Sequence, residues 1–226
     1  MTATQMLDGP FLPPRSGQAK QMVIFLHGYG SNGDDLLSIG EEWAPHMPDT
    51  VFLSPNAPSV CEMWAGGFQW FSLRAADGID SKALERADKI REPAAILNAY
   101  IDAKLAEWGV GENKLAVAGF SQGAMMAMYT MPRRATACAG VIGYSGLLVD
   151  PAGLGTAGIV KPPVLAIHGA ADEVVPPACL TGVQEGFEAA GFDIETIMRP
   201  GLGHGIDHVG LTRGLAFIKT GLGLED

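Results

Sequence analysis

The sequence predicts an α/β fold with one mostly parallel central sheet and helices on both of its faces. Short aliphatic runs alternate with helical patterns from about residue 20 to the end of the chain. Several of these runs are apolar at every position, which is typical of strands covered by helices on each side. Since no internal repeat, charge block or low-complexity linker divides the sequence, we expect one domain over residues 1–226, with residues 1–20 as an N-terminal extension or an edge hairpin.

Six segments are predicted to be strands because they are short and rich in β-branched and aliphatic residues. They are Met22–His27, Thr50–Ser54, Lys114–Gly119, Ala139–Tyr144, Val164–His168 and Asp193–Met198.

The clearest helical pattern places apolar residues at steps of three and four from Leu84 to Trp108. Pro93 is expected to kink or restart that helix, because proline lacks an N–H and crowds the preceding turn. Other helices are expected after Gly33, after Ser121, from about Pro177 to Ala190, and after Gly205. The alternation of strand and helix indicates a doubly wound sheet.

Composition and charge exclude several classes of partner. The formal net charge is −10, from 25 acidic and 15 basic residues, so phosphate backbones and anionic head groups are repelled and no nucleic acid is expected as a partner. The longest uncharged run, Ala135–Val149, is too short to span a bilayer, so no stable membrane insertion is expected. The N-terminal stretch lacks the basic cluster and apolar core of a secretory signal, which predicts a cytoplasmic protein.

The strongest chemical motif is Gly119-Phe120-Ser121-Gln122-Gly123, which follows one predicted strand and precedes a helical run. A nucleophile elbow requires a strained turn from strand to helix, and the flanking glycines relieve the crowding in it. The bare pentapeptide could also be a simple glycine-rich turn. Its place between strand and helix favours Ser121 as a nucleophile at the carboxyl edge of the sheet.

A serine hydroxyl needs a base to accept its proton, and the base needs a carboxylate to orient it. The order expected after a nucleophile elbow is serine, acid, histidine. Asp172 lies just past a predicted strand end, where open α/β sheets hold their sites, although it could instead cap a turn or the next helix. His204 is the one titratable residue of the glycine-rich loop after the last strand. We therefore predict a catalytic triad of Ser121, Asp172 and His204.

A serine nucleophile also requires backbone donors for the oxyanion of its tetrahedral intermediate. One is expected from the residue after the nucleophile, Gln122, and the other from an early loop between strand and helix. The loop at His27-Gly28-Tyr29-Gly30 fits, and the N–H of Tyr29 is the predicted second donor. His27 precedes the nucleophile in the chain and is expected to brace this loop.

Two alternatives to a serine hydrolase remain at this level. The segment from Gly28 to Gly33 reads as G-x-G-x-x-G, but a dinucleotide site also needs an acidic residue after the second strand, where Ser54 and Asn56 stand. The fold could also bind ligands without catalysis, although all three triad residue types are present. His204 and His208 have the spacing of metal ligands but lack the Glu of H-E-x-x-H and a third ligand, so no metal is expected.

With these motifs the chain resembles the phospholipase/carboxylesterase family of α/β-hydrolases, which includes bacterial carboxylesterases and acyl-protein thioesterases. The resemblance runs from about Met22 to Leu222. It is carried by FLHGYGSNGDDL (Phe25–Leu36), QWFSL (Gln69–Leu73), AGFSQGAMMA (Ala118–Ala127), HGAADEVVP (His168–Pro176) and GLGHGI (Gly201–Ile206).

The resemblance implies a compact α/β-hydrolase without a large cap domain. It would hydrolyse short- to medium-chain carboxylic esters through an acyl-enzyme, with thioesters or lysophospholipids as alternative substrates of the same triad. It implies no cofactor, and a homodimer is possible. Ser121, Asp172 and His204 match the triad of the family, and Tyr29 and Gln122 match its oxyanion donors. Tyr29 stands where the eukaryotic thioesterases usually have Leu, which favours a bacterial-type esterase.

The connection from Pro55 to Asp80 is long for an α/β loop and rich in aromatic residues. It could fold over the site and form a wall for the acyl or aryl group, or it could pack against the sheet. The predicted substrate-binding residues are Trp64, Phe68, Trp70 and Phe71.

Overall fold

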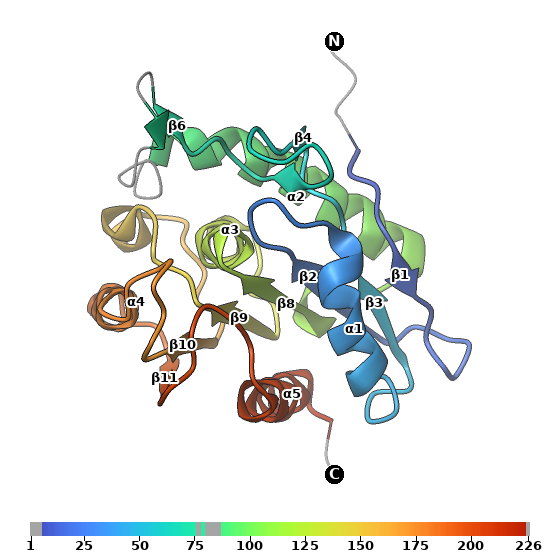
Figure 1. Cartoon of the computed structure of the whole chain (residues 1–226). Coiled ribbons are helices and arrows are strands. Elements are labelled where there is room, and N and C mark those ends of the chain that lie inside the picture. The colour runs from blue at the N-terminus through green and yellow to red at the C-terminus, as the bar shows by residue number, and fades with distance from the viewer. Residues whose placement is uncertain (1–5, 76–77, 80–86, 225–226) are drawn as a thin grey trace.

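The computed structural model describes residues 6–75, 78–79 and 87–224 and is built around a seven-stranded sheet (Figure 1). The strand order is β1-β3-β2-β8-β9-β10-β11, and all neighbours are parallel except β1 and β3. All six predicted strands are present, with ends shifted by no more than one residue. The strands are β1 (Phe11–Leu12), β2 (Gln21–Leu26), β3 (Thr50–Leu53), β8 (Leu115–Phe120), β9 (Gly140–Tyr144), β10 (Val164–Gly169) and β11 (Ile194–Arg199).

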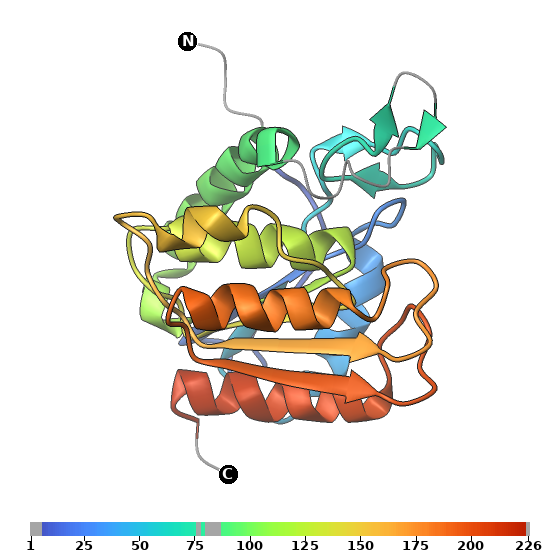
Figure 2. The same cartoon turned by 90° about the vertical axis from the view of Figure 1, so that its left-hand side faces the viewer.

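Helices cover both faces of the sheet, as predicted. Figure 2 shows α4 on one side of β10 and β11 and α5 on the other. The α2 helix runs through Pro93, so the expected restart there is wrong. Leu84, where the predicted helical pattern begins, lies outside the described residues. The helices are α1 (Gly33–Trp43), α2 (Ala87–Trp108), α3 (Gln122–Thr130), α4 (Cys179–Ala189) and α5 (His208–Leu222), with short 3-10 turns η2 (Glu112–Lys114), η3 (Met131–Arg133) and η4 (Pro151–Gly155).

The central strands are buried at every position or nearly so because each face of the sheet builds its own core. In β2, Met22, Ile24 and Leu26 pack into the core beneath α2, α3 and α4. Val23 and Phe25 point the opposite way, into the core beneath α1 and α5. This period-two alternation buries every β2 side chain, so a two-sided sheet explains the pattern seen in the sequence.

The longest connection in the described part of the chain joins β3 to α2 and stands above the carboxyl edge of the sheet (Figure 2). It contains the antiparallel pairs β4 (Ser59–Val60) with β5 (Phe68–Gln69) and β6 (Arg74–Ala75) with β7 (Gly78–Ile79). No separate cap domain is inserted in the described ranges. Nor does any helix within them combine the length and apolar character needed to cross a membrane.

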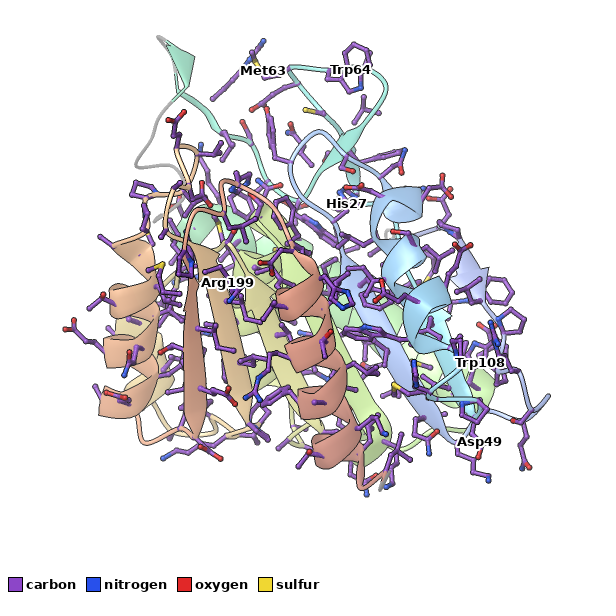
Figure 3. The ribbon with its side chains drawn as sticks, turned by 60° about the horizontal axis from the view of Figure 1, so that its bottom comes forward. His27, Asp49, Met63, Trp64, Trp108 and Arg199 are labelled. Carbon is purple, nitrogen blue, oxygen red and sulfur yellow. The ribbon has the colours of Figure 1, made fainter. Side chains whose placement is uncertain are left out.

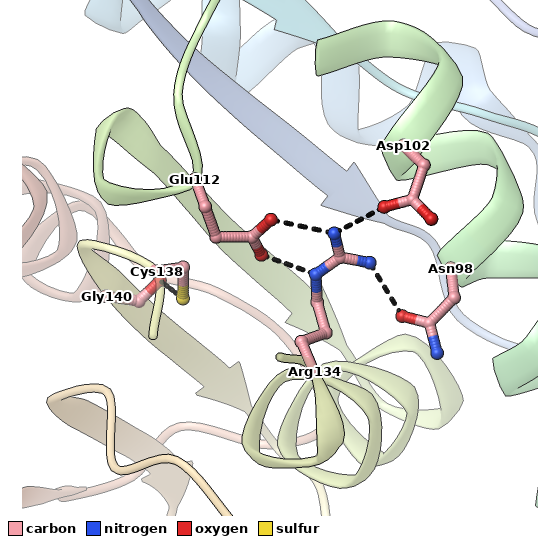
Figure 4. Close-up of polar contacts among 6 residues, drawn as sticks. All are labelled: Asn98, Asp102, Glu112, Arg134, Cys138 and Gly140. Atoms are coloured by element: carbon pink, nitrogen blue, oxygen red, sulfur yellow. Dashed lines mark hydrogen bonds and ion pairs between the residues drawn. The ribbon is translucent and has the colours of Figure 1, made fainter. Parts of the chain in front are cut away.

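At the amino edge of the sheet, opposite the β3–α2 connection, a buried arginine links two neighbouring elements (Figure 4). The Arg134 side chain, 7% exposed, donates to both carboxylate oxygens of Glu112 in η2. It also donates to Oδ1 of Asp102 at 2.7 Å and to Oδ1 of Asn98 at 2.8 Å, both in α2. Burial alone would lower the pKa of Arg134, but the two carboxylates outweigh it and raise that pKa. The guanidinium therefore joins α2 to the turn that opens β8.

Candidate active site

Ser121 occupies a strained turn between β8 and α3. Its φ of 53° is uncommon for a residue with a side chain, and its N–H donates to the Tyr144 carbonyl at 2.9 Å. A Cβ at Gly119 would lie 2.2 Å from the Gly123 carbonyl oxygen, and one at Gly123 would lie 1.9 Å from the Leu26 oxygen. Only glycine fits at both flanks, and the turn places Ser121 at the carboxyl edge of the sheet with 9% of its surface exposed.

The three predicted triad residues lie together although they come from three different loops. His204, in the loop between β11 and α5, has its Nε2 3.0 Å from the Ser121 hydroxyl oxygen. Its Nδ1 is 2.8 Å from Oδ2 of Asp172, in the loop after β10. The ring of Phe120 packs against the His204 ring at 4.8 Å between centroids. The result is an unbroken hydrogen-bonded line from carboxylate to imidazole to hydroxyl.

Asp172 is buried, and its two carboxylate oxygens have separate partners. Oδ1 accepts the N–H groups of Val174 and Val175 at 2.9 Å each, while Oδ2 faces His204. Asp172 therefore also stabilises the turn in which it lies, which is the alternative role that its position in the sequence suggested. Burial would raise the pKa of Asp172, but the hydrogen bonds from His204, Val175 and Val174 outweigh it and hold that pKa below its ordinary value. The group is therefore held as a carboxylate.

Tyr29 and Gln122 line the same cavity as Ser121. Gln122 is the first residue of α3, so its N–H has no acceptor within the helix. In the described part of the chain, the N–H of Tyr29 likewise has no hydrogen-bond acceptor. Two backbone N–H groups without an acceptor thus lie beside the nucleophile, which suits a site for developing negative charge.

His27 braces the loop that carries Tyr29. Its Nε2 accepts the Ala57 N–H at 2.9 Å, so Nδ1 carries the proton and donates to the Gly28 carbonyl at 2.8 Å (Figure 3). Burial lowers the pKa of His27, although its hydrogen bond to Gly28 and the charge of Asp35 oppose this shift. Both ring nitrogens are occupied by backbone groups, and the imidazole is neutral.

The four aromatic residues predicted to bind substrate are not among the residues that line the cavity at Ser121. Trp64 is 66% exposed at the tip of the β4–β5 segment and points away from the sheet (Figure 3), and Phe68 is half-buried. Trp70 and Phe71 are buried, and the Gln122 side chain holds their backbone: it accepts from the Trp70 N–H and donates to the Phe71 carbonyl, each at 2.8 Å. The bulk of this aromatic set is core.

Two cavities meet at the triad, and their walls were missed at the sequence level. The nucleophile cavity, about 240 Å³, has apolar walls that come from positions within the family motifs to which no substrate-binding role was given: Leu73, Phe120, Met125, Val174 and Val175. The α1–α5 cavity, about 330 Å³, shares Asp35, Phe120 and His204 with it; its lining is Asp35, Leu36, Ser38, Ile39, Phe120, His204, Gly205, Ile206 and Leu211.

The dinucleotide alternative conflicts with the packing of the glycine-rich loop. The N–H of Gly33, which opens α1, already donates to Oδ1 of Asn56 at 2.9 Å, and the Asp34 N–H donates to Asn32. A Cβ at Gly33 would lie 2.0 Å from the Ser54 carbonyl oxygen. The amides that would bind a pyrophosphate are therefore occupied by the chain itself.

The metal spacing noted between His204 and His208 does not produce a cluster. His208 begins α5 with an 85% exposed side chain, and its Nδ1 is 3.9 Å from Oε1 of Glu42. Among the described residues, no three His, Cys, Asp or Glu side chains gather in a way that could hold a metal ion.

Comparisons with known proteins agree with this geometry. The family model described as Phospholipase/Carboxylesterase matches residues 8–222. Esterase YpfH of Escherichia coli (strain K12) is 31% identical over 195 residues, covering 84% of this chain and 78% of that protein. Acyl-protein thioesterase 1 of Neurospora crassa is 29% identical over 212 residues, covering 86% of this chain and 84% of that protein.

The crystal structure of esterase PE8 superimposes on this fold with a TM-score of 0.89 and 39% identity, covering 96% of this chain and 99% of that one. The family match spans nearly the whole chain, and both the sheet and the turn at Ser121 have the form expected of such a hydrolase. The chain therefore belongs to the phospholipase/carboxylesterase family of α/β-hydrolases.

Proposed function

We propose that this protein is a serine carboxylesterase that hydrolyses short- to medium-chain carboxylic esters through an acyl-enzyme. The observation that carries the proposal is the hydrogen-bonded line from Asp172 through His204 to the Ser121 hydroxyl. The name of the E. coli relative, an esterase, supports the same reaction.

The geometry gives each group a definite step. The Ser121 oxygen attacks the ester carbonyl while His204 Nε2 accepts the hydroxyl proton, and Asp172 keeps the other ring proton on Nδ1. The carbonyl oxygen becomes an oxyanion that the N–H groups of Tyr29 and Gln122 stabilise. His204 then returns the proton to the departing alcohol oxygen, and water releases the acid by the same sequence. No cofactor takes part in these steps.

The walls of the nucleophile cavity favour a modest acyl group. Leu73, Met125, Val174 and Val175 offer apolar surface beside Ser121. The volume, about 240 Å³, lies below the roughly 300–1,000 Å³ typical of pockets for drug-sized ligands. A short or medium chain can be desolvated there, whereas a long one would extend past the described walls.

Thioester cleavage by the same triad is the second candidate. It is favoured by the similarity to acyl-protein thioesterase 1, and lysophospholipid cleavage is the third possibility within the family description. A homodimer and a cytoplasmic location stay predictions, to be tested by light scattering of the purified protein and by fractionation of cells.

The proposal is tested with p-nitrophenyl esters from acetate to palmitate, with an acyl-CoA and a lysophospholipid as comparison substrates. We expect the highest kcat/KM on the short and medium esters. Ser121→Ala should lower kcat about a thousandfold or more while retaining the circular dichroism of the wild type, because removing a member of a triad disables the unit. Equal activity of variant and wild type, or a wild type inert on every substrate, would overturn the proposal.

A further inference from the structure

The two cavities present different groups to a bound ester. The nucleophile cavity contains both candidate oxyanion donors, Tyr29 and Gln122, together with Ser121. The α1–α5 cavity contains none of these three and opens instead against His204 and Phe120. His204, Phe120 and Asp35 line both cavities, so the two spaces adjoin at these side chains, and His204 Nε2 lies 3.0 Å from the Ser121 hydroxyl oxygen.

The chemistry of the tetrahedral intermediate assigns a different substituent to each space. Its oxyanion must face the N–H groups of Tyr29 and Gln122. Its leaving oxygen must lie within hydrogen-bond reach of His204 Nε2, because that atom supplies the proton as the bond between carbon and the leaving oxygen breaks. The group attached to the leaving oxygen therefore extends past His204, toward the α1–α5 cavity, and the acyl group stays against Met125, Val174 and Val175.

One side chain with a full charge, Asp35, faces this route. It lies in the first turn of α1, is exposed, and lines both cavities. Its Oδ2 accepts the Ser31 hydroxyl at 2.7 Å, which fixes the carboxylate at the rim. Among the described residues of the two linings, no lysine or arginine offsets this charge; the remaining walls are apolar or neutral apart from the imidazole of His204.

We propose that the α1–α5 cavity receives the leaving group of the ester and that Asp35 selects cationic or neutral leaving groups over anionic ones. The inference rests on the proposed esterase reaction and adds the class of alcohol to it. Leu36, Ile39 and Leu211 supply apolar contact to the body of the alcohol, and the Asp35 carboxylate attracts a quaternary ammonium or hydroxyl group at its end. Phosphate-bearing leaving groups, such as coenzyme A, are repelled at the same position.

Asp34 provides a matched control. It is the neighbouring acid of the same helical turn, is also exposed, and lines neither cavity. Replacing either aspartate by asparagine removes one negative charge from the amino end of α1 and leaves a residue of the same size. A change found only with Asp35 therefore reports position, whereas one shared by both reports the field of the helix end or of the whole protein.

The test uses three butyrate esters with one acyl group and different leaving alcohols: choline, the uncharged isostere 3,3-dimethylbutanol, and 3-hydroxypropanesulfonate. For each protein, kcat/KM of each charged ester is divided by that of the neutral ester, and the ratio is compared with that of the wild type. This comparison cancels the intrinsic reactivity of the esters. We expect Asp35→Asn to lower the cationic ratio about threefold and raise the anionic ratio by a similar factor, as for an exposed charge pair, with a smaller effect at high salt.

The outcomes separate this inference from the esterase proposal. If the wild type hydrolyses the esters but Asp35→Asn leaves the ratios unchanged, or Asp34→Asn shifts them as much, the role of Asp35 is overturned and the esterase stands. If the wild type hydrolyses p-nitrophenyl butyrate but none of the three, the inference is overturned and the esterase stands; if it hydrolyses neither p-nitrophenyl butyrate nor any of the three, both proposals fall. A shift of the kcat/KM ratios in Asp35→Asn but not in Asp34→Asn establishes the role of Asp35.

Discussion

At the residue scale, the hydrogen-bond partners of His27 and His204 show which of these two histidines can transfer a proton. Both ring nitrogens of His27 are bonded to backbone groups, and its burial keeps it neutral. His204 has a carboxylate on one nitrogen and the Ser121 hydroxyl on the other. Of the two, only His204 can therefore exchange a proton with a bound ester. For that, the ring proton must lie on Nδ1, the nitrogen that faces Asp172, so that Nε2 is free to accept the proton of Ser121.

Replacing Asp172 by asparagine should reverse that tautomer. The Oδ1 of Asp172 accepts two turn N–H groups, from Val174 and Val175, so an asparagine would keep its oxygen there and turn its NH₂ toward His204 Nδ1. Nδ1 must then be unprotonated, so the ring proton lies on Nε2. A protonated Nε2 cannot accept the hydroxyl proton of Ser121. We expect kcat on p-nitrophenyl butyrate to fall about 10⁴-fold with little change in KM.

The control for this variant is Glu173→Gln, which removes the charge of the adjacent, exposed acid. Its kcat should equal that of the wild type. A kcat for Asp172→Asn within about tenfold of the wild type would show that the carboxylate does not set the tautomer, since loss of this role costs far more in a triad.

The sequence could predict a triad of residues that lie together in the structure because the chemistry expected of them is tied to local context. Ser121, Asp172 and His204 each stand directly after a strand in a turn rich in glycine or small residues. The cavity walls could not be read in this way. Trp70 and Phe71 have the composition of a binding wall, but both side chains are buried. Gln122, which hydrogen-bonds their backbone, is 52 and 51 residues away in the chain. Long-range packing of this kind leaves no local signal.

At the element scale, Glu62 holds the connection above the site together. Its Oε1 accepts the N–H groups of Leu73 and Arg74 at 2.8 and 3.0 Å and the hydroxyl of Tyr29 at 3.1 Å, and its Oε2 accepts the Ser72 hydroxyl at 2.7 Å. Burial would raise the pKa of Glu62, but these hydrogen bonds outweigh it and lower that pKa. One carboxylate therefore connects β4, β6 and the loop of the predicted oxyanion donor Tyr29.

Replacing Glu62 by glutamine should loosen this connection at neutral pH, because the amide NH₂ cannot accept the bonds made to one of the oxygens. We expect faster hydrogen exchange at the N–H groups of Leu73 and Arg74, measured by mass spectrometry. The folded pKa of Glu62 lies below its ordinary value of 4.5, so its stabilisation is complete above 4.5 and is lost as the pH falls through the folded pKa.

The difference between Glu62→Gln and the wild type should therefore shrink below about pH 4.5. Glu107→Gln, at an exposed glutamate of α2, should exchange like the wild type at every pH. Equal protection of Leu73 and Arg74 in Glu62→Gln and the wild type at neutral pH would show that the carboxylate does not organise the segment.

At the scale of the whole molecule, the predicted triad and the buried Arg134 contacts lie at opposite edges of the parallel sheet. Ser121, Asp172 and His204 follow the carboxyl ends of β8, β10 and β11, so the parallel order brings them to one edge. The Arg134 clamp lies at the opposite edge, where η2 leads into the start of β8 (Figure 4). The alternation of strands and helices predicted this sheet, but no local pattern in the sequence identified the partners of Arg134.

Arg134→Met should destabilise the protein without changing the reaction. It keeps apolar contacts of the side chain but leaves Glu112, whose side chain is 16% exposed, without its cation. We expect the free energy of unfolding in urea to fall by about 3 kcal/mol, as when one partner of a buried ion pair is removed, with kcat unchanged. Arg213→Met, which breaks an exposed pair with Glu195, should cost less than about 1 kcal/mol. Equal losses in both variants would contradict a special role for the clamp.

The central claim, that Ser121 is the nucleophile activated by His204, is tested most directly by covalent labelling. The folded protein is treated with diethyl p-nitrophenyl phosphate, and the adduct is located by mass spectrometry of its peptides. We expect one diethylphosphoryl group on Ser121, no adduct in Ser121→Ala, and much slower labelling of Ser121 in His204→Asn, because the hydroxyl then lacks its base. Labelling of a different residue, or labelling of Ser121→Ala at the rate of the wild type, would contradict it.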